Sequence, residues 1–226
     1  MCNIKFESKQ GQDKWVIDIL KYKKFGYFVD TGASDGIRNS NSYALEKHFD
    51  WTGICVEPNP NLRAFPTLIK NRNCICESVC VHSENTTVDF LARGRHIETS
   101  GIYGDFSSTY IKYQHNDKSH PTIKLNAITL LQLLQKHKSP NVIDYISIDT
   151  EGSEWEILRV FDFNQYIFKT MTIENNFNGD DNNNEEKLHR DNIRNLLYAR
   201  GYVLKNSLHF GEDWFVHNSI EYRDVV

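Results

Sequence analysis

The sequence contains no apolar run long enough to cross a membrane and no cationic segment followed by an apolar stretch near its start. A membrane helix needs about 18 or more consecutive apolar residues, so we expect no membrane span. Without a signal-peptide pattern, we expect a cytoplasmic rather than a secreted protein. Positive charge is not in excess either, since the formal net charge is −4. The chain therefore has no general attraction to nucleic-acid phosphates, and we expect no nucleic-acid partner.

Cysteine is sparse and odd in number, with five residues that lack the paired spacing of a zinc site. Cys74, Cys76, Cys80 and His82 would share one face of an extended strand but spread over roughly 26 Å, at about 3.3 Å per residue. A zinc ion needs its ligands about 2.0–2.3 Å away. We interpret these residues as half-buried thiols on a strand, and the unpaired count as typical of a reducing compartment.

Strands and helices alternate along most of the 226 residues, a length that suits one ordinary domain. The apolar periodicity predicts helices at about 13–24, 42–49, 62–70, 129–136, 155–160 and 186–199, with Pro66 as a distortion. Strands are predicted near 28–31, 53–57, 73–81, 123–128, 142–148, 170–173, 202–204 and 214–216. This alternation predicts an α/β fold with a parallel, doubly wound sheet.

The stretch Phe28–Gly36 reads Phe-Val-Asp-Thr-Gly-Ala-Ser-Asp-Gly, an apolar strand followed by a turn rich in acids and glycines. Such a turn lies at the carboxyl end of a parallel sheet, where nucleotide-like cofactors bind. A dinucleotide fingerprint needs G-x-G-x-x-G, and here the third glycine is missing. Asp30, two residues before Gly32, could meet an ammonium group. S-adenosylmethionine has an ammonium and no pyrophosphate, so we assign Asp30, Gly32 and Asp35 to its binding.

The next strand ends in Glu57-Pro58-Asn59-Pro60, and Glu57 lies 25 positions after Gly32 (57 − 32). An acid at about that distance, at the tip of the second strand, accepts hydrogen bonds from ribose hydroxyls. NAD and S-adenosylmethionine both contain this ribose, so Glu57 alone does not separate them. We expect Glu57 to bind the ribose and place Asn59 in the same site; the alternative is a surface acid after a core strand.

The alternation of strands and helices breaks between residues 92 and 121, a segment that mixes Gly, Ser and His with four aromatic residues: Tyr103, Phe106, Tyr110 and Tyr113. Loops this long in a compact domain usually form functional lids or are disordered. Aromatic faces favour sugars and other rings, although they also simply pack an insertion onto its domain. We therefore predict a substrate lid and keep the packing role as its alternative.

Acids gather where two core strands end: Asp149-Thr150-Glu151-Gly152-Ser153-Glu154 follows one, and Glu174-Asn175-Asn176 follows the other. Asp149, Glu174 and Asn175 could supply three oxygen ligands to magnesium or manganese, which would keep other sites for water and substrate hydroxyls. Alternatively, acids near a helix start are stabilised by the helix dipole. We assign that capping role to Glu154 and keep Asp149 and Glu174 as candidates for chemistry.

Together these blocks resemble the FkbM-type S-adenosylmethionine-dependent methyltransferases. The blocks that carry the resemblance are Phe28–Gly36, Gly53–Pro60, Asp144–Glu154, Ile173–Asn176, Gly201–Tyr202 and Asp213–Val216. The run Asp-Thr-Glu-Gly-Ser-Glu is the most specific of them. The family's fifth-strand motif usually reads Glu-His-Asn, and here Asn175 occupies the histidine position. Any duty of that histidine is therefore open in this chain.

The resemblance implies one Rossmann-like class I methyltransferase domain over residues 1–226, with a seven-stranded, mostly parallel sheet, helices on both faces and an insertion after the third strand. It also implies an O-methyltransferase acting on a small molecule, or on a hydroxyl of a sugar or glycan such as a deoxyhexose. Either a carboxylate or histidine takes the hydroxyl proton, or a metal lowers its pKa. Asp149 suits both schemes; Glu151, Glu174, His115 and His120 are further candidates.

Two other classes of protein stay open. A nucleic-acid methyltransferase would usually carry an Asn/Asp-Pro-Pro-aromatic loop after its fourth strand, whereas Asp149–Gly152 lacks prolines and the chain is acidic. A non-catalytic glycan- or protein-binding domain with a vestigial cofactor pocket is the other alternative. The acids Asp30, Glu57 and Asp149, present together, favour an enzyme over such a domain.

Overall fold

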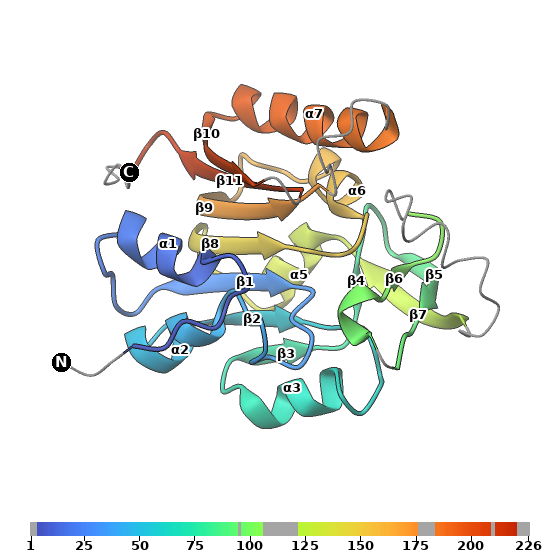
Figure 1. Cartoon of the computed structure of the whole chain (residues 1–226). Helices are drawn as coiled ribbons and strands as arrows, with labels where there is room; N and C mark the ends of the chain where they lie inside the picture. Colours follow the sequence, from blue (N-terminus) through green and yellow to red (C-terminus); the bar gives the residue numbers. More distant parts are fainter. Residues whose placement is uncertain (1–3, 95, 106–121, 176–183, 209–210, 221–226) are drawn as a thin grey trace.

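The computed structural model describes residues 4–94, 96–105, 122–175, 184–208 and 211–220 (Figure 1). Its helices are α1 (Gln12–Ile19), α2 (Tyr43–Phe49), α3 (Phe65–Asn71), the 3-10 turn η1 (Ile97–Thr99), α5 (Leu130–Lys136), α6 (Glu154–Arg159) and α7 (Asn184–Ala199). Its strands are β1 (Tyr27–Thr31), β2 (Thr52–Val56), β3 (Ile75–Glu77), β4 (Cys80–Val81), β5 (Thr86–Leu91), β6 (Gly101–Ile102), β7 (Thr122–Ile128), β8 (Val142–Ile148), β9 (Ile167–Glu174), β10 (Tyr202–Leu208) and β11 (Glu212–His217).

The main sheet has seven strands in the order β10-β11-β9-β8-β1-β2-β3 (Figure 1). Strands β9, β8, β1, β2 and β3 run parallel, while β11 pairs antiparallel with both β9 and β10. The chain moves outward from β1 to β3 and then returns to build β8 and β9 on the other side of β1. The order therefore reverses between β1 and β8, and in doubly wound sheets the crevice outside that reversal binds ligands.

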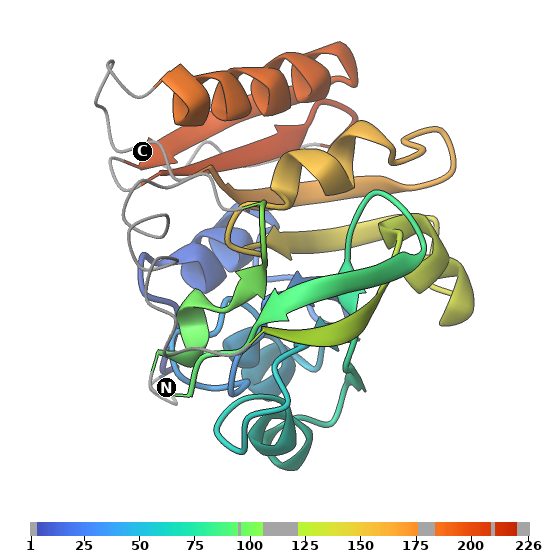
Figure 2. The same cartoon turned by 90° about the vertical axis from the view of Figure 1, so that its right-hand side faces the viewer.

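A second, four-stranded sheet in the order β4-β7-β5-β6 comes between β3 and β8 in the chain. Figure 2 views the molecule from the side at which the parallel strands end, and it shows the second sheet in front of the main one. The single strand predicted over 73–81 is wrong: β3 stays in the main sheet, whereas β4 pairs with β7 in the second. β3 and β4 are both extended, so the apolar periodicity alone does not reveal that they belong to different sheets.

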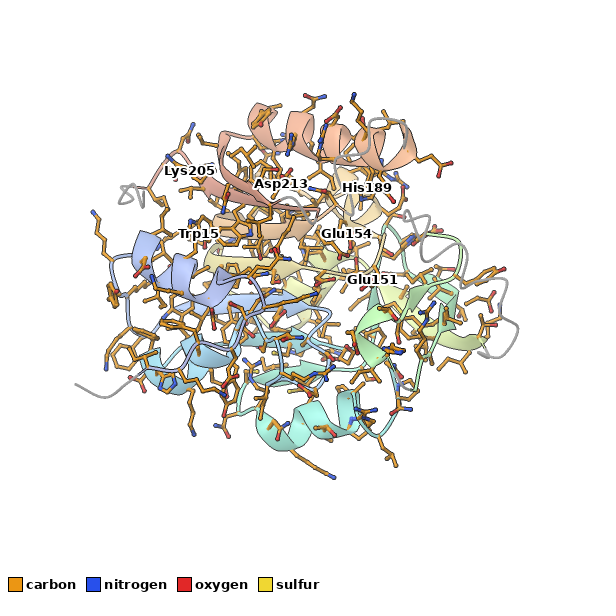
Figure 3. All side chains as sticks on the ribbon, in the orientation of Figure 1. Trp15, Glu151, Glu154, His189, Lys205 and Asp213 are labelled. Atoms are coloured by element: carbon orange, nitrogen blue, oxygen red, sulfur yellow. The ribbon has the colours of Figure 1, made fainter. Side chains whose placement is uncertain are left out.

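Different helices cover the two faces of the main sheet. On one face Trp15 of α1, Leu45 of α2 and Leu68 of α3 enter a single buried cluster. The centroid of the Trp15 ring lies 5.0 Å from that of the Trp214 ring; Trp15 is labelled in Figure 3. On the other face, side chains of α5, α6 and α7 form the larger core. This arrangement confirms the predicted fold: a seven-stranded, mostly parallel sheet with helices on both faces.

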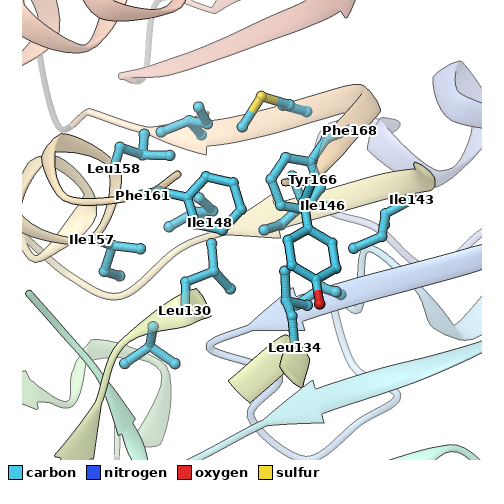
Figure 4. Close-up of a cluster of buried hydrophobic side chains, with 14 of the residues drawn as sticks. Leu130, Leu134, Ile143, Ile146, Ile148, Ile157, Leu158, Phe161, Tyr166 and Phe168 are labelled. Carbon is cyan, nitrogen blue, oxygen red and sulfur yellow. The ribbon is translucent and has the colours of Figure 1, made fainter. Parts of the chain in front are cut away.

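The strand β8 shows how the sequence divides between these two cores. Tyr145 belongs to the cluster with Trp15, whereas Ile146 and Ile148 belong to the other cluster, in which Leu130 and Leu158 also lie (Figure 4). Tyr145 and its neighbour Ile146 lie in different cores because successive side chains of a strand point to opposite faces of the sheet. β8 is buried on both faces, as its nearly continuous apolar run requires.

Two helix boundaries differ from the sequence prediction. The first helix ends at Ile19, not near 24, because Lys21 and Tyr22 adopt positive φ angles of 57° and 58°. Pro66 lies in the first turn of α3, where its missing N–H would have no partner in the helix anyway, so it starts the helix and does not distort it. In the part of the chain that is described, no helix has the length and apolarity needed to span a membrane.

Candidate active site

A pocket of about 490 Å³ opens at the carboxyl ends of β1, β2, β8 and β9, where the strand order reverses. Seven of the residues that line it carry carboxyl groups, namely Asp30, Glu57, Glu98, Asp149, Glu151, Glu174 and Glu212. Among the described residues, Lys9 and Arg38 are the ones that supply basic side chains to the lining. The pocket is therefore acidic, and it suits a ligand that brings positive charge or hydroxyl groups.

The glycine turn lies directly against the end of β8. Gly32 has a φ of +87°, and a Cβ atom on this residue would be 1.8 Å from the backbone oxygen of Asp149. The N–H of Asp149 in turn donates to the carbonyl of Thr31 at 3.2 Å. Gly36, at φ +81°, leaves 2.6 Å between its would-be Cβ and Leu68. Both glycines are thus required by backbone conformation and close packing.

Asp30 lines the pocket, although only 3% of its surface is exposed. One of its carboxyl oxygens accepts a hydrogen bond from the hydroxyl of Ser42, which also accepts one from Arg72 at 3.1 Å. Burial raises the pKa of Asp30, and the hydrogen bond from Ser42 partly opposes that rise. This network fixes the floor of the pocket under the glycine turn.

Glu57 connects the end of β2 to the same turn. Its two carboxyl oxygens accept hydrogen bonds from the backbone N–H groups of Ser34 and Asn59, each at 2.8 Å. Burial raises the pKa of Glu57 to about 7, against the effect of these two N–H donors. The residue lines the pocket, and each oxygen retains a lone pair that could accept from a ribose hydroxyl.

Two residues assigned to cofactor binding from the sequence are not among those that line the pocket. Asp35 accepts hydrogen bonds from the N–H groups of Ile37 and Arg38, at 2.9 and 2.8 Å, and so shapes the turn. Asn59 donates to the carbonyl of Arg93 at 3.0 Å and the hydroxyl of Ser100 at 2.9 Å, which ties β2 to the insertion. Cofactor contact by either residue stays a prediction.

Asp149, Glu151 and Glu174 converge at the base of the pocket, each with a carboxyl oxygen within 4.8 Å of the others. Asp149 is exposed to the pocket, whereas Glu151 and Glu174 are half-buried. Desolvation, followed by the charge of Glu154, raises the pKa of Asp149 to about 7. Glu174 is hydrogen-bonded to Asp149, and burial, followed by the charges of Asp149 and the nearby acids, raises the pKa of Glu174.

The third predicted metal ligand, Asn175, has a different environment. Its side chain is only 2% exposed, and its backbone N–H donates to the carbonyl of Gly211 at 2.7 Å. It is not among the residues that line the pocket. The structure instead brings Glu151 beside Asp149 and Glu174. The candidate bases His115 and His120 lie outside the described residues, as does most of the predicted lid.

Glu154 lies in the first turn of α6, as the capping prediction requires, and its side chain also holds the preceding loop. Its buried carboxylate accepts hydrogen bonds from the N–H groups of Thr150 at 2.8 Å and Gly152 at 3.2 Å, which flank Glu151. Its second oxygen lies 3.5 Å from Nε2 of His189 (Figure 3). Although burial opposes the shift, His189 and the N–H donors hold the pKa of Glu154 below its usual value. Glu154 thereby supports Glu151 in its positive φ of 62°.

A second contact joins this loop to the insertion sheet. The hydroxyl of Ser153 donates to Oδ2 of Asp105 at 2.8 Å, and Nε2 of His82 lies 2.9 Å from the same oxygen. The hydrogen bond to Asp105 raises the pKa of His82. The insertion is therefore held to the acid-bearing loop on one side and, through Asn59, to the end of β2 on the other.

Sequence reasoning missed one wall of the pocket. Lys9, Gln10 and Gln12 line it from the N-terminal segment, and Glu212 lines it from β11. Gln12 donates to Glu212 at 2.8 Å, and burial raises the pKa of Glu212 to about 8. An acid opening the strand beside β9 was a usable signal for Glu212. Nothing in the local pattern before the first helix marks a binding residue.

A small apolar recess of about 30 Å³ adjoins the pocket between the two sheets. The side chains that make it apolar include Val56, Pro58, Val79, Val81, Phe90 and Ile102. Gly32, Glu57 and Asp149 line both this recess and the main pocket. The polar cavity and the apolar recess therefore meet at the glycine turn.

A family profile described as "Methyltransferase FkbM domain" matches residues 30–204. The chain therefore belongs to the FkbM methyltransferase family. The crystal structure of a fibrillarin/Nop5p complex contains a similar chain, with 10% sequence identity, a TM-score of 0.37, and coverage of 85% of this chain and 72% of that one. A comparison with curated proteins gives no match. Family membership, with the observed fold, identifies a methyltransferase domain.

Proposed function

We propose that this protein is an S-adenosylmethionine-dependent O-methyltransferase that methylates a hydroxyl group of a sugar or glycan, for example of a deoxyhexose. The observation that carries the proposal is the position of Asp149. It lies in the pocket of an FkbM fold, against the glycine turn and beside Glu174, with its pKa raised to about 7. A carboxylate poised near neutral pH suits general-base chemistry on a hydroxyl.

The lining of the pocket fits the cofactor. S-adenosylmethionine carries positive charge on its sulfonium and ammonium groups, and the acidic lining complements both. Glu57 would accept from the ribose hydroxyls, and the apolar side chains around the recess beside it would give the adenine ring a surface to pack against. A dinucleotide fits less well, because α2 begins only at Tyr43 and places no helix N-terminus beside Gly32 and Gly36 for a pyrophosphate.

The cofactor, when bound, supplies an electrophilic methyl group for in-line transfer to an oxygen nucleophile. Asp149 would accept the proton of the acceptor hydroxyl as the oxygen attacks. Glu174, which is hydrogen-bonded to Asp149, would fix the orientation of that carboxylate. Glu151 and Glu212 lie on the same lining and would receive other hydroxyl groups of the acceptor.

A divalent cation is the alternative means of activating the hydroxyl. Asp149 and Glu174, with Glu151 in the place expected for Asn175, have carboxyl oxygens close enough together to bind one magnesium or manganese ion. A cation at that point would lower the pKa of the bound hydroxyl and stabilise the developing alkoxide. The two schemes use the same residues and differ in their response to a chelator.

The charges of the pocket also bear on the acceptor. Among the described residues the lining has seven carboxyl-bearing residues and two basic ones, and so offers few partners to an acceptor that carries phosphate. Carboxylate and amide groups such as those of Glu212 and Gln12 are good partners for hydroxyls. These features favour a neutral, hydroxyl-rich acceptor over a nucleic acid or a sugar phosphate.

The proposal is tested in two steps. Calorimetry with S-adenosylmethionine asks whether the cofactor binds, and labelled methyl transfer onto a panel of free sugars and glycans asks for the acceptor. Asp149→Asn should bind the cofactor but lose transfer. Absence of cofactor binding would identify a vestigial pocket, and transfer only to non-sugar acceptors would identify another small-molecule methyltransferase.

A further inference from the structure

The N-terminal segment from Glu7 to Gln12 forms part of the pocket, although it lies outside the residues 30–204 that define the family match. Lys9, Gln10 and Gln12 are all in the lining. The segment precedes β1 in the chain and reaches the carboxyl end of the sheet on its way into α1. It therefore adds to the pocket a wall that the family signature does not describe.

Both ends of this segment are fixed. On one side Asp13, fully buried, accepts from the N–H groups of Glu7 at 2.7 Å and Ser8 at 3.2 Å, and Ser8 forms a β-bridge with Asn39. On the other side Gln12 is held by Glu212. Lys9 lies between these anchors, beside the loop that follows the glycine turn. The backbone therefore holds the Lys9 side chain at the pocket.

The charges around Lys9 give it a specific use. Within the described residues its ammonium group has no ion pair within 4 Å, whereas Arg38, the other basic residue of the lining, lies 3.5 Å from Glu98. S-adenosylmethionine has one anionic group, the α-carboxylate of its methionine part. Since the described lining has seven carboxyl groups and two basic side chains, a basic side chain is the complementary partner for that group.

We propose that Lys9 binds the α-carboxylate of S-adenosylmethionine, so that the N-terminal segment is part of the cofactor site. This inference rests on the proposed function, because it requires that cofactor in the pocket. The α-ammonium would then face the acids near Asp30, at the opposite end of the same amino-acid group. The two ends of the methionine part are thus distinguished by charge.

Decarboxylated S-adenosylmethionine provides the decisive probe, because it keeps every part of the cofactor except the carboxylate. Calorimetry with both compounds should show that Lys9→Met weakens S-adenosylmethionine by about tenfold or more, the usual size of a charge-assisted hydrogen bond. Binding of the decarboxylated compound should be unchanged. Lys9→Arg keeps the charge and should retain most of the affinity.

Lys5→Met is the matched control, since Lys5 is exposed, pairs with Glu7 at 2.6 Å and is not in the pocket lining. It should leave both affinities unchanged. Equal weakening of the two compounds by Lys9→Met, or no weakening of either, would overturn the role of Lys9 while leaving the proposed function intact. If the wild-type protein bound neither compound, the proposed function would fail as well.

Discussion

The backbone of Gly32 lies against the carbonyl group of Asp149, so closely that a Cβ atom on residue 32 would be 1.8 Å from the carbonyl oxygen. Because of this contact, the turn assigned to the cofactor and the candidate base belong to one rigid unit. The end of β1 and the end of β8 cannot move apart without breaking the hydrogen bond from Asp149 to Thr31. Cofactor binding and catalysis would then depend on the same few atoms of backbone.

Gly32→Ala should therefore be severely destabilising, because it adds both a steric clash and the strain of a positive φ. The φ strain alone costs about 1–2 kcal/mol for an L-residue. Gly104→Ala isolates that part: Gly104 has a φ of +105°, and its added Cβ would meet nothing within 4 Å. Thermal unfolding should show a much larger loss for Gly32→Ala than for Gly104→Ala. If the two variants lost the same stability, the contact between Gly32 and the Asp149 carbonyl would not explain the effect of Gly32→Ala.

Cofactor affinity should increase with pH between about 6 and 8. The pKa of Glu57 in the free protein is about 7, and hydroxyl groups donate more strongly to its ionised form. Binding would thus favour ionisation, and affinity would rise as Glu57 loses its proton, by up to about tenfold over this range. Above pH 8 the effect should level off. Calorimetry at several pH values measures it.

Glu57→Gln is the matching variant, since it keeps the shape of the side chain without the titration. It should bind the cofactor about 1–3 kcal/mol more weakly and flatten the pH dependence. Glu57 also accepts from Ser34 and Asn59, so circular dichroism must first show that the variant is folded. A folded Glu57→Gln protein with wild-type affinity would remove Glu57 from the ribose site.

The positions of the main acids could be predicted from the sequence, and the reason is physical. Asp30, Asp149 and Glu174 each end or follow an apolar run, and parallel strands bring such ends to one edge of the sheet. Gly32 marked the turn because few other residues adopt its φ of +87°. For these residues, the local sequence pattern is enough to predict the position in the fold.

The remaining parts of the site depend on contacts that local pattern does not encode. Glu154 looked like a helix cap because it begins α6, but its hydrogen bonds to Thr150 and Gly152 arise from the loop's conformation. Lys9 lies at the pocket because contacts such as the bridge between Ser8 and Asn39 hold the segment there. Pairings between residues distant in sequence, such as this bridge, need the fold itself.

Asp105 should stabilise the protein most at acidic pH. Because Asp105 raises the pKa of His82, the contact contributes while His82 is protonated and is lost as pH rises through the raised pKa. Glu156 also raises this pKa and Arg159 lowers it. Thermal unfolding should therefore show Asp105→Asn less stable than wild type near pH 5.5, with the gap narrowing toward pH 8.5.

Asp89→Asn is the control for that comparison, since Asp89 lies in the same insertion sheet and pairs with Lys124 at 2.7 Å on the surface. Its effect should be small and without the same pH trend. Asp105→Asn should also lower methyl transfer more than cofactor affinity, because Asp105 accepts a hydrogen bond from Ser153, in the loop that carries Glu151. Cofactor binding that falls in step with transfer would mean a general loss of structure.

A chelator decides between the two ways of activating the acceptor. If a cation bound by Asp149, Glu151 and Glu174 activates the hydroxyl, excess EDTA should abolish transfer, and added magnesium or manganese should restore it. Cofactor affinity should change much less, because the cation would act on the acceptor oxygen and the developing alkoxide. Full activity in excess chelator would exclude the metal scheme.

Variants of the three acids also distinguish the metal scheme from the general-base scheme. Under the metal scheme Asp149→Asn, Glu151→Gln and Glu174→Gln each remove a ligand, and each should raise the magnesium concentration needed for half-maximal activity. Under the general-base scheme Asp149→Asn should abolish transfer, whereas Glu174→Gln should be comparatively mild, because a glutamine amide can still hydrogen-bond to Asp149. A much lower activity of Asp149→Asn than of Glu174→Gln would therefore indicate that Asp149 acts as a general base, whereas similar losses in both variants would indicate metal ligands.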